Sequence, residues 1–438
     1  MAELDVVSVC SELIRFDTTN RGNGDAEGER AAAEYVAGLL TDAGLSPRIL
    51  ESAPGRANVV ARVEGSDPSL PALLVQGHLD VVPADAADWA VPPFAGEVRD
   101  GFLWGRGATD MKDFCAMVLS VLDTFAREGR KPRRDIVLAF VADEEDRGDY
   151  GAHWLVEHHP SLFDGCAAAI SESGGYTYHV PAADGRTVRL YPVGAAERGT
   201  AHLRLTARGR AGHGSRRNHE NAVIRLVAAL NRIATHQWPV HLTPATRAFI
   251  EQTGKALDVP VDLSDSDAVD GTLARLGPAA ALVEAMVRNS TTPTMLEAGY
   301  KVNVIPSVAH AQVDTRTLPD TEEDLLATVD ELLGPDVTRE FVAHQPPVQA
   351  PVDSPWFDAM AAALRAQDPD AVVVPYCMGG GTDAKAFAKL GIQCYGFAPL
   401  WLPQGFHYRA MAHGVDERVP VEGLHFGSRA LAHLFTHC

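Results

Sequence analysis

One stretch constrains the fold more than any other: a short run of apolar residues that ends in a histidine and an aspartate. Residues 73–83 read LLVQGHLDVVP, in which His78 and Asp80 directly follow the apolar run. A continuous apolar run of this length, bounded by turn residues, is typical of a buried strand in a parallel sheet. Open α/β sheets bind their ligands at the carboxyl ends of such strands. The stretch therefore predicts an α/β fold with a ligand site near His78.

Two interpretations of the histidine and the aspartate stay open at this point. Side chains two residues apart in a strand point to the same side, so the carboxylate of Asp80 is expected beside the imidazole of His78. A carboxylate in that position fixes the imidazole tautomer and strengthens the ring as a metal ligand. The structural alternative is a core histidine whose hydrogen bonds are satisfied by the neighbouring aspartate.

Length and charge limit what the chain can be. A chain of 438 residues is too long for a single hydrophobic core, so two domains are expected. The formal net charge of −20 argues against a nucleic-acid surface, which needs clustered lysine and arginine, and it tolerates bound cations. No apolar stretch reaches the roughly 18 uncharged residues that a membrane span needs. We therefore expect neither a nucleic-acid partner nor a membrane partner.

The cysteines are consistent with a reducing compartment. Six cysteines are scattered along the chain without a CxxC pair, so neither a thiolate zinc site nor a redox motif is expected. The opening residues, MAELDVVSVC, contain no basic segment followed by an apolar core, so no signal peptide is expected. A cytoplasmic location is the prediction that follows.

The order of strands and helices predicts how the chain is divided. Segments 56–63 and 72–76 are expected as neighbouring strands of one large sheet. From about residue 200 the pattern becomes β-α-β-β-α-β, which matches a ferredoxin-like unit with an extra segment, 236–287, inserted in it. We therefore predict a large domain formed by two parts of the chain and interrupted by a smaller one, with these bounds: 1–198, 199–345 and 346–438.

Several predicted strands and loops end in side chains that can bind a metal. Imidazole and carboxylate ligands without a thiolate suit Zn²⁺, and Co²⁺ or Mn²⁺ can replace it. Imidazoles do not neutralise a cation, so paired carboxylates are needed to balance one or two divalent ions. Two ions roughly 3.5–4 Å apart stabilise the attacking and the leaving oxygen together. The candidate side chains are His78, Asp80, Asp110, Glu144, Glu145, Glu172 and His413.

The adjacent pair Glu144 and Glu145 has two possible roles. In an extended strand end, neighbouring side chains face opposite ways, so one glutamate can bind metal while the other faces the substrate. A carboxylate close to a metal-bound water is a suitable general base. Alternatively, the DEED run around these residues is a solvated acidic turn.

Six motifs in order resemble one known family. GHLDVVP, WAVPPF, GRGATDMK, ADEED, GGTDA and AHGVDER are similar to motifs of the zinc hydrolases of metallopeptidase family 20. That family includes carboxypeptidase G, aminoacylase, succinyl-diaminopimelate desuccinylase and acetylornithine deacetylase. The resemblance covers nearly the whole chain. It implies an α/β/α catalytic domain with an inserted ferredoxin-like α+β lid or dimerisation domain, and it allows for a homodimer formed through that domain.

The resemblance also implies which residues bind metal. It implies two zinc ions per subunit, with the carboxylate of Asp110 bridging them. His78 and Glu172 would complete one site, and Glu145 and His413 would complete the other. The family has a cis peptide bond after its bridging aspartate, so one is expected after Asp110.

Three further residues receive catalytic roles from the resemblance. Glu144 would be the general base and would later carry the proton to the leaving amine, while Asp80 would be the partner of His78. His213, in the sequence GRAGHGS, would stabilise the oxyanion in the active site of the partner subunit. Members of the family often have a small residue other than glycine before this serine, so the motif departs mildly from the pattern. Taken alone, His213 would be interpreted as a surface or strand-end histidine.

The resemblance points to contacts with a substrate carboxylate as well. Asn303 in NVIP and Arg316 in DTR are similar to positions that make such contacts, and a guanidinium fork suits a carboxylate. A structural salt bridge from Arg316 to Asp314 or Glu297 is the alternative. A glycine-rich turn, which could equally be a flexible turn, offers backbone N–H groups to the same carboxylate: Gly380, Gly381 and Thr382.

Together these features predict an enzyme that hydrolyses an amide or peptide bond next to a free carboxylate. Its substrate would be a dipeptide, the C-terminal residue of a peptide or an N-acyl amino acid. Alternatives are a deacylase of N-succinyl or N-acetyl amino acids, as in the diaminopimelate or ornithine pathways, and a non-catalytic member that binds metal or peptide. A related aminopeptidase is a further alternative, but such enzymes usually lack the inserted domain.

Overall fold

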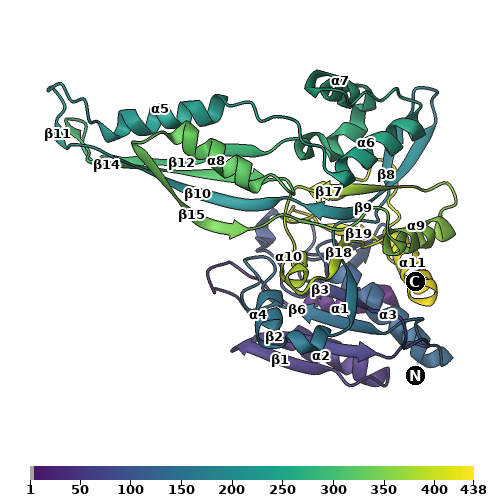
Figure 1. The fold of residues 1–438 in the computed structure, drawn as a ribbon. Helices are drawn as coiled ribbons and strands as arrows, with labels where there is room; N and C mark the ends of the chain where they lie inside the picture. The colour runs from purple at the N-terminus through teal and green to yellow at the C-terminus, as the bar shows by residue number, and fades with distance from the viewer. Residues whose placement is uncertain (1–3) are drawn as a thin grey trace.

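The computed structural model describes residues 4–438, which form one large mixed sheet and a smaller four-stranded sheet (Figure 1). The order of strands in the large sheet is β1-β2-β6-β3-β7-β18-β9-β16, and β8 and β17 also pair with β9. Its strands are β1 (Arg48–Ala53), β2 (Arg56–Val63), β3 (Ala72–His78), β6 (Ile136–Val141), β7 (Cys166–Ser171), β8 (Tyr178–Pro181), β9 (Thr187–Glu197), β16 (Val348–Gln349), β17 (Val372–Met378) and β18 (Gln393–Gly396). A three-stranded sheet is formed by β4 (Glu97–Arg99), β5 (Phe102–Trp104) and β19 (Arg418–Pro420).

The centre of the large sheet is parallel, as the apolar runs predicted. Strand β3 pairs in parallel with β6 on one side and with β7 on the other, so the carboxyl ends of all three lie at one edge. Every residue of β3 and of β6 is buried. The expected adjacency of 56–63 and 72–76 is wrong, because β6 lies between β2 and β3.

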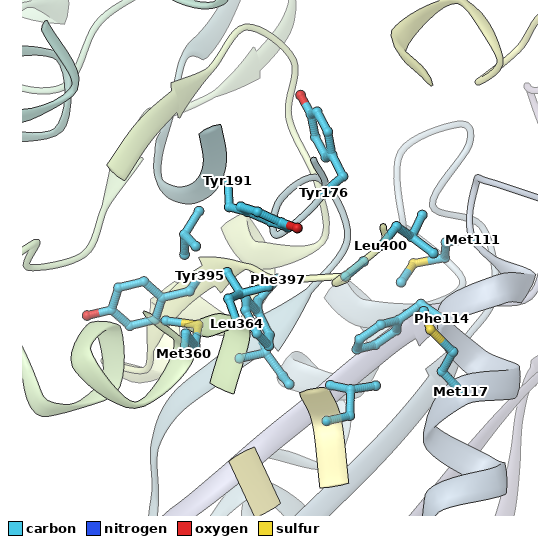
Figure 2. Packing of buried hydrophobic residues seen from close by; sticks show 14 of the residues in the cluster. Met111, Phe114, Met117, Tyr176, Tyr191, Met360, Leu364, Tyr395, Phe397 and Leu400 are labelled. Carbon is cyan, nitrogen blue, oxygen red and sulfur yellow. The ribbon is translucent and has the colours of Figure 1, made fainter. Parts of the chain in front are cut away.

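Helices cover both faces of this sheet, which confirms the α/β class. Leu73 and Val75 of β3 pack in a core shared with α1 (Val6–Arg15), α2 (Arg30–Asp42), α3 (Lys112–Glu128), α9 (Pro355–Gln367) and α11 (Val421–His437). Between them, Leu74 points to the opposite face, into a second core with α4 (Ala152–His158) and α10 (Ala384–Phe387). Figure 2 shows part of the first core, in which aromatic and sulfur-containing side chains from distant segments gather.

The small sheet has the predicted β-α-β-β-α-β order. Its elements are β10 (Gly199–Arg208), α5 (Ala222–Thr235), β12 (Ser290–Ala298), β14 (Val308–Thr317), α8 (Glu322–Leu333) and β15 (Val337–Gln345). The strands lie in the order β12-β14-β10-β15, and each neighbouring pair is antiparallel. Alternate residues of β14 are buried and form a core of their own with α5 and α8. The long ribbon of β9 and β10 joins this sheet to the large one (Figure 1).

The segment 236–287 packs differently from what its position in the sequence suggested. It contains α6 (Pro244–Leu257), α7 (Ser266–Leu276) and the short 3₁₀ turns η3 (Gly277–Leu282) and η4 (Glu284–Met286). Phe249 and Ile250 of α6 belong to the core of the large sheet, and α6 packs against β17 and β9. The helices lie above β17 and β8 in Figure 1, on the large sheet and not on the small one.

Two expectations about the chain as a whole can be checked in the structure. All six cysteines are free thiols. Among residues 4–438, no helix combines the length and the apolar character that crossing a bilayer requires.

Candidate metal centre

Three parallel strands and two loops bring the predicted metal ligands together. His78 is the last residue of β3, Glu172 directly follows β7, and Glu145 lies in the turn after β6. Asp110 comes from the loop before α3 and His413 from the loop before β19. Because β3, β6 and β7 end at the same edge of the sheet, their terminal side chains meet there.

The five side chains form two groups that share one residue. Ligand atoms of His78, Asp110 and Glu172 all lie within 4.8 Å of one another, and so do those of Asp110, Glu145 and His413. The two oxygens of Asp110 face different groups: Oδ1 lies 3.0 Å from Nε2 of His78, and Oδ2 lies 3.3 Å from Nε2 of His413. Nε2 of His413 is also 2.9 Å from Oε2 of Glu145. The carboxylate of Asp110 therefore has the position of a bridging ligand.

The chemistry of this donor set fits divalent cations. Oε1 of Glu145 and Oε1 of Glu172 are buried, and neither has a hydrogen-bond donor among residues 4–438. A buried carboxylate oxygen without a donor is costly, whereas a bound cation would satisfy it. Three carboxylates and two imidazoles without a thiolate are the ligand types that Zn²⁺, Co²⁺ and Mn²⁺ accept.

The pKa values of the acidic groups reflect their burial and their mutual repulsion. Burial raises the pKa of Glu172 well above its usual range, and the charge of Asp110 adds to the effect. Glu144 has a pKa raised in the same way, first by burial and then by the charge of Glu172. Burial also acts to raise the pKa of Asp110, but hydrogen bonds with His413 and His78 outweigh it and lower the value. The site is thus a dense negative cluster that attracts cations.

The structure also contains the expected cis peptide bond between Asp110 and Met111. Two residues of the site have left-handed backbone conformations, Asp143 with φ of 70° and His413 with φ of 60°. Residues other than glycine rarely adopt this conformation, and such residues cluster at functional sites.

Asp80 acts on different atoms from those predicted. Nδ1 of His78 donates a hydrogen bond to the backbone carbonyl of Asp80 at 2.9 Å, while the carboxylate of Asp80 is 3.6 Å from the same nitrogen. That carboxylate instead accepts hydrogen bonds from the backbone N–H groups of Glu144 at 3.1 Å and Glu145 at 3.2 Å. The carboxylate of Asp80 thus lies beside the imidazole, as expected, but the hydrogen bond that orients His78 goes to the backbone carbonyl of Asp80, and the carboxylate holds the acidic turn.

Sequence analysis missed a layer of polar residues behind this turn. The side-chain amide of Asn20 donates to Asp80 at 2.9 Å and to Asp143 at 3.0 Å. Arg56 donates to Asp143 at 2.8 Å and makes two hydrogen bonds with Glu29. Asn20 ends the polar sequence TTN, which by itself is typical of a surface loop, so the sequence held no signal of this role.

Glu417 is a further residue that sequence analysis missed. It is fully buried and accepts hydrogen bonds from the loop that leads to Asp110. Its signal was present, because Glu417 and Arg106 both lie within the motifs that carry the family resemblance.

Two other predicted site residues lie far from the predicted metal ligands of their own chain. His213 belongs to β11 (Gly212–His213), an exposed strand at the far end of the small sheet (Figure 1). Its Nδ1 lies 2.9 Å from the hydroxyl of Ser215. Asn303 is beside it, where its backbone carbonyl accepts a hydrogen bond from Gly214 at 2.9 Å. Within one chain the structure does not bring His213 or Asn303 to the metal ligands.

Arg316 and Thr382, two of the residues predicted to contact a substrate carboxylate, make hydrogen bonds with other side chains of the protein. Arg316 donates to both carboxylate oxygens of Asp314, at 2.7 and 3.3 Å, and to the hydroxyl of Thr200 at 3.1 Å. This is the structural salt bridge that the sequence left open. Thr382 donates from its N–H and its hydroxyl to Glu197, at 3.0 and 2.5 Å. The exposed candidates of the same turn are Gly380 and Gly381.

The fold and these side chains together match one family of proteins. The model of the family described as Peptidase family M20/M25/M40 matches residues 74–437. The chain therefore belongs to this family of hydrolytic enzymes, as its motifs predicted.

Curated relatives are similar over most of their length. A probable carboxypeptidase S-like 2 of Dictyostelium discoideum is 28% identical over 372 residues, which cover 83% of this chain and 71% of the relative. The N-fatty-acyl-amino acid synthase/hydrolase PM20D1 of Xenopus tropicalis is 29% identical over 402 residues, covering 90% and 78%. Aminoacylase-1 of Sus scrofa is 28% identical over 397 residues, covering 89% and 85%.

Solved structures show the same fold at lower identity. The M20 family metallo-carboxypeptidase Sso-CP2 from Sulfolobus solfataricus has a TM-score of 0.70 and 18% identity, with 99% of both chains covered. Human carnosine dipeptidase 1 has a TM-score of 0.63 and 18% identity, with 98% of this chain and 95% of that chain covered. The YXEP protein of Bacillus subtilis, titled a dinuclear metal binding peptidase, has a TM-score of 0.60 and 14% identity, covering 98% and 96%.

Proposed function

We propose that this enzyme hydrolyses an amide or peptide bond next to a free carboxylate, with two divalent cations bound at the candidate metal centre. The substrate would be a dipeptide, a peptide with a free C-terminal residue or an N-acyl amino acid. The observation that carries the proposal is the pair of ligand groups that share the carboxylate of Asp110. The printed names of the relatives, which include a carboxypeptidase and aminoacylase-1, support the same class of reaction.

In this proposal, His78, Asp110 and Glu172 hold one cation, and Asp110, Glu145 and His413 hold the other. The donor set suits Zn²⁺, with Co²⁺ or Mn²⁺ as substitutes. Two such cations would polarise the scissile carbonyl group and lower the pKa of a water molecule between them.

Glu144 is the acidic residue of the centre that binds neither cation in this proposal, so it is free to transfer a proton between water and the leaving amine. Its side chain is 14% exposed and reaches within 4.0 Å of Nε2 of His78, yet it belongs to neither ligand group. It can therefore take a proton from water and deliver it to the leaving amine. Asp80 keeps Glu144 in place through the hydrogen bond from the backbone N–H of Glu144.

A homodimer would supply the oxyanion contact that a single chain lacks. Strand β12 is an edge of the small sheet and exposes Met295 and Leu296 by about 60%, which is unusual for an edge that faces water. On the same unit, α5 exposes Ile224 and Val227. Pairing of two small sheets along this surface would direct the partner subunit's His213 toward the metal centre. We take 199–345 as the inserted unit, with 236–287 returning to the large sheet.

A substrate screen tests the proposed reaction. N-acetyl amino acids, N-succinyl amino acids and dipeptides would be tested with Zn²⁺, Co²⁺ or Mn²⁺, using wild-type protein and a Glu144→Gln variant. We expect metal-dependent hydrolysis by the wild type and a loss of about 10²-fold or more in the variant, which should still bind metal. Preference for the N-succinyl compounds would favour the deacylase alternative. A metal-loaded wild type that hydrolyses none of them would contradict the proposal, and a cytoplasmic location stays a separate prediction.

A further inference from the structure

One buried cation lies behind the acidic turn, between two buried carboxylates. Arg56, the first residue of β2, is only 5% exposed. Its Nε and Nη2 atoms donate to the two oxygens of Glu29, both at 3.0 Å. Nη2 also donates to Oδ1 of Asp143 at 2.8 Å. The guanidinium group therefore joins Glu29, which comes directly before α2, to Asp143, the residue before Glu144.

Stability alone does not explain this cluster. Glu29, Asp80 and Asp143 are each at most 1% exposed. A buried ion pair seldom stabilises a fold more than apolar side chains of the same volume would. In addition, Nη1 of Arg56 is buried and has no hydrogen-bond acceptor among residues 4–438. Proteins retain costly buried groups of this kind chiefly at functional sites, so we looked for an effect of the cluster on the metal centre.

Asp143 is the point at which the cluster meets the acidic turn. Its carboxylate accepts hydrogen bonds from three separate segments: from Asn20 at 3.0 Å, from Arg56 at 2.8 Å and from the backbone N–H of Tyr150 at 3.1 Å. Its backbone is left-handed, with φ of 70°, which is unfavourable for a residue with a Cβ atom. These contacts hold Asp143 in that conformation and so set the direction of the two glutamates that follow it.

The guanidinium group is itself fixed from a further side. Its central carbon lies over the ring of Tyr150, 5.1 Å from the ring centroid. The planar fork of Arg56 thus contacts Glu29, Asp143 and Tyr150 at the same time. An ammonium group is a compact point charge and cannot reproduce a forked and stacked geometry. The shape of this side chain is therefore used as well as its charge.

The cluster is also coupled to Asp80, which holds the acidic turn by its N–H groups. Burial raises the pKa of Glu29 to about 7 and the charge of Asp80 adds to the effect, whereas the hydrogen bonds from Arg56 lower the pKa. The amide of Asn20 bridges Asp80 and Asp143, at 2.9 and 3.0 Å. Three carboxylates this close repel one another when ionised, and the charge of Arg56 offsets that repulsion.

We propose that Arg56 is a positioning residue for the proposed reaction: its guanidinium group fixes Asp143 and thereby directs the side chains of Glu144 and Glu145 toward the metal centre. This inference rests on the proposed function. It gives a role to a residue of β2, a strand that supplies none of the proposed metal ligands.

The location of the turn makes the expected effect selective. Of the proposed ligands, only Glu145 lies in the turn after β6, and it shares its cation with His413 and Asp110. The other cation would be held by residues at the ends of β3 and β7 together with Asp110. A disturbance at Arg56 should therefore weaken the binding of one cation and spare the other.

The test replaces Arg56 by a residue that keeps its charge. Arg56→Lys still pairs with one carboxylate, so it should fold, but it lacks the planar fork. The matched control is Arg62→Lys in the same strand, where the exposed Arg62 donates to Asp135 at 2.9 Å. With the best substrate of the screen, kcat should fall about 10- to 100-fold in Arg56→Lys while KM changes less than about twofold. Arg62→Lys should resemble the wild type, and a kcat in Arg56→Lys equal to that of this control would overturn the inference.

A metal titration separates this inference from the proposed reaction. Metal-free protein would be titrated with Co²⁺ alone and followed by visible absorption, which requires no turnover. Arg56→Lys should bind one Co²⁺ as tightly as the wild type does and the second roughly 10-fold more weakly. Unchanged binding of both ions, or equal weakening of both, would overturn the role of Arg56. A wild type that does not bind two ions would overturn both proposals, whereas one that binds two and hydrolyses nothing counts against the proposed function alone.

A cycle of variants tests whether Arg56 acts through Asp143. Asp143→Asn keeps the size of the side chain but removes the charge that pairs with Arg56. The double variant should lose no more than about twofold beyond the more impaired single variant, both in kcat and in affinity for the second Co²⁺. Losses that multiply would show that the two residues act independently and would overturn the proposed connection.

Discussion

Thr109 donates two hydrogen bonds to one carboxylate oxygen of Glu417, from its backbone N–H at 2.7 Å and from its hydroxyl at 2.9 Å. The other oxygen of Glu417 accepts from Arg106 at 2.7 Å and from the N–H of Gly107 at 3.0 Å. Thr109 precedes Asp110, the proposed shared ligand, and Glu417 follows the loop of His413. This buried carboxylate therefore joins the two loops that carry the proposed ligands from outside the sheet.

Replacing Glu417 should disturb both folding and metal binding. In a Glu417→Gln variant the charge of Arg106 is left buried without its partner, which costs about 3–5 kcal/mol. We expect a fall of that order in the free energy of unfolding, measured with denaturant, together with a lower metal content. The control is Glu422→Gln, an exposed residue 3.5 Å from Arg429, which should change stability by less than about 0.5 kcal/mol. Full metal content in Glu417→Gln would show that the carboxylate does not position the ligands.

Asp80 should affect catalysis through the acidic turn. An Asp80→Asn variant keeps the size of the side chain but loses one of the two oxygens that hold the N–H groups of Glu144 and Glu145. Residues behind a metal site typically contribute 10- to 100-fold to metal affinity or activity, and we expect a loss of about that size. Activity and metal affinity would be compared with those of Asp88→Asn, an exposed aspartate in the loop after β3. Unchanged values in Asp80→Asn would refute the role assigned to it.

The proposed dimer makes a prediction about mixed subunits. His213→Ala and Glu144→Gln homodimers should each be nearly inactive. In a heterodimer of the two, one active site combines a native Glu144 with the partner subunit's His213, so about half of the wild-type activity should return. Heterodimers purified with two different tags would be assayed beside both parents. If the heterodimer is as inactive as its parents, the partner does not supply this histidine.

The ion pair between Arg189 and Asp368 should make part of the stability depend on pH. A hydrogen bond from Arg189 lowers the pKa of Asp368, against the opposing effect of burial. A carboxyl group with a lowered folded-state pKa stabilises the fold above its unfolded pKa, about 3.9, and loses this contribution as the pH falls through the folded value. The gap in unfolding free energy between wild type and Arg189→Gln should therefore be constant from neutral pH down to about 5 and shrink below about 4. A gap that does not change with pH would contradict this assignment.

Much of the site could be predicted because its ligands follow short, strongly apolar strands. The runs that end at His78, Glu145 and Glu172 are buried on both faces, so their composition indicates parallel strands and their ends must share an edge. The alternation along β14 and the helical pattern of α5 likewise indicate the small sheet. The local sequence pattern was sufficient to predict these strands and helices, because the burial of their side chains alone determines which element they form.

Other features depend on contacts that no local pattern records. Strand β9 was not predicted, because Pro192 and Gly194 interrupt its apolar run and normally mark loops. Gly194 is needed there, since a Cβ atom on it would lie 3.0 Å from the backbone of Gly396 in β18. An amphipathic helix such as α6 shows which of its faces is buried but not which sheet covers that face. For the same reason, the hydrogen-bond partner of Arg316 and the acceptor of the His78 N–H could be identified only from the three-dimensional structure.

The most direct test of the central claim is anomalous diffraction from crystals of the zinc-loaded enzyme. The account predicts two zinc peaks per chain, one bound by His78 and Glu172 and the other by Glu145 and His413, with the carboxylate of Asp110 between them. Peaks located elsewhere, or no peak at these side chains in protein that hydrolyses its substrate, would contradict the account.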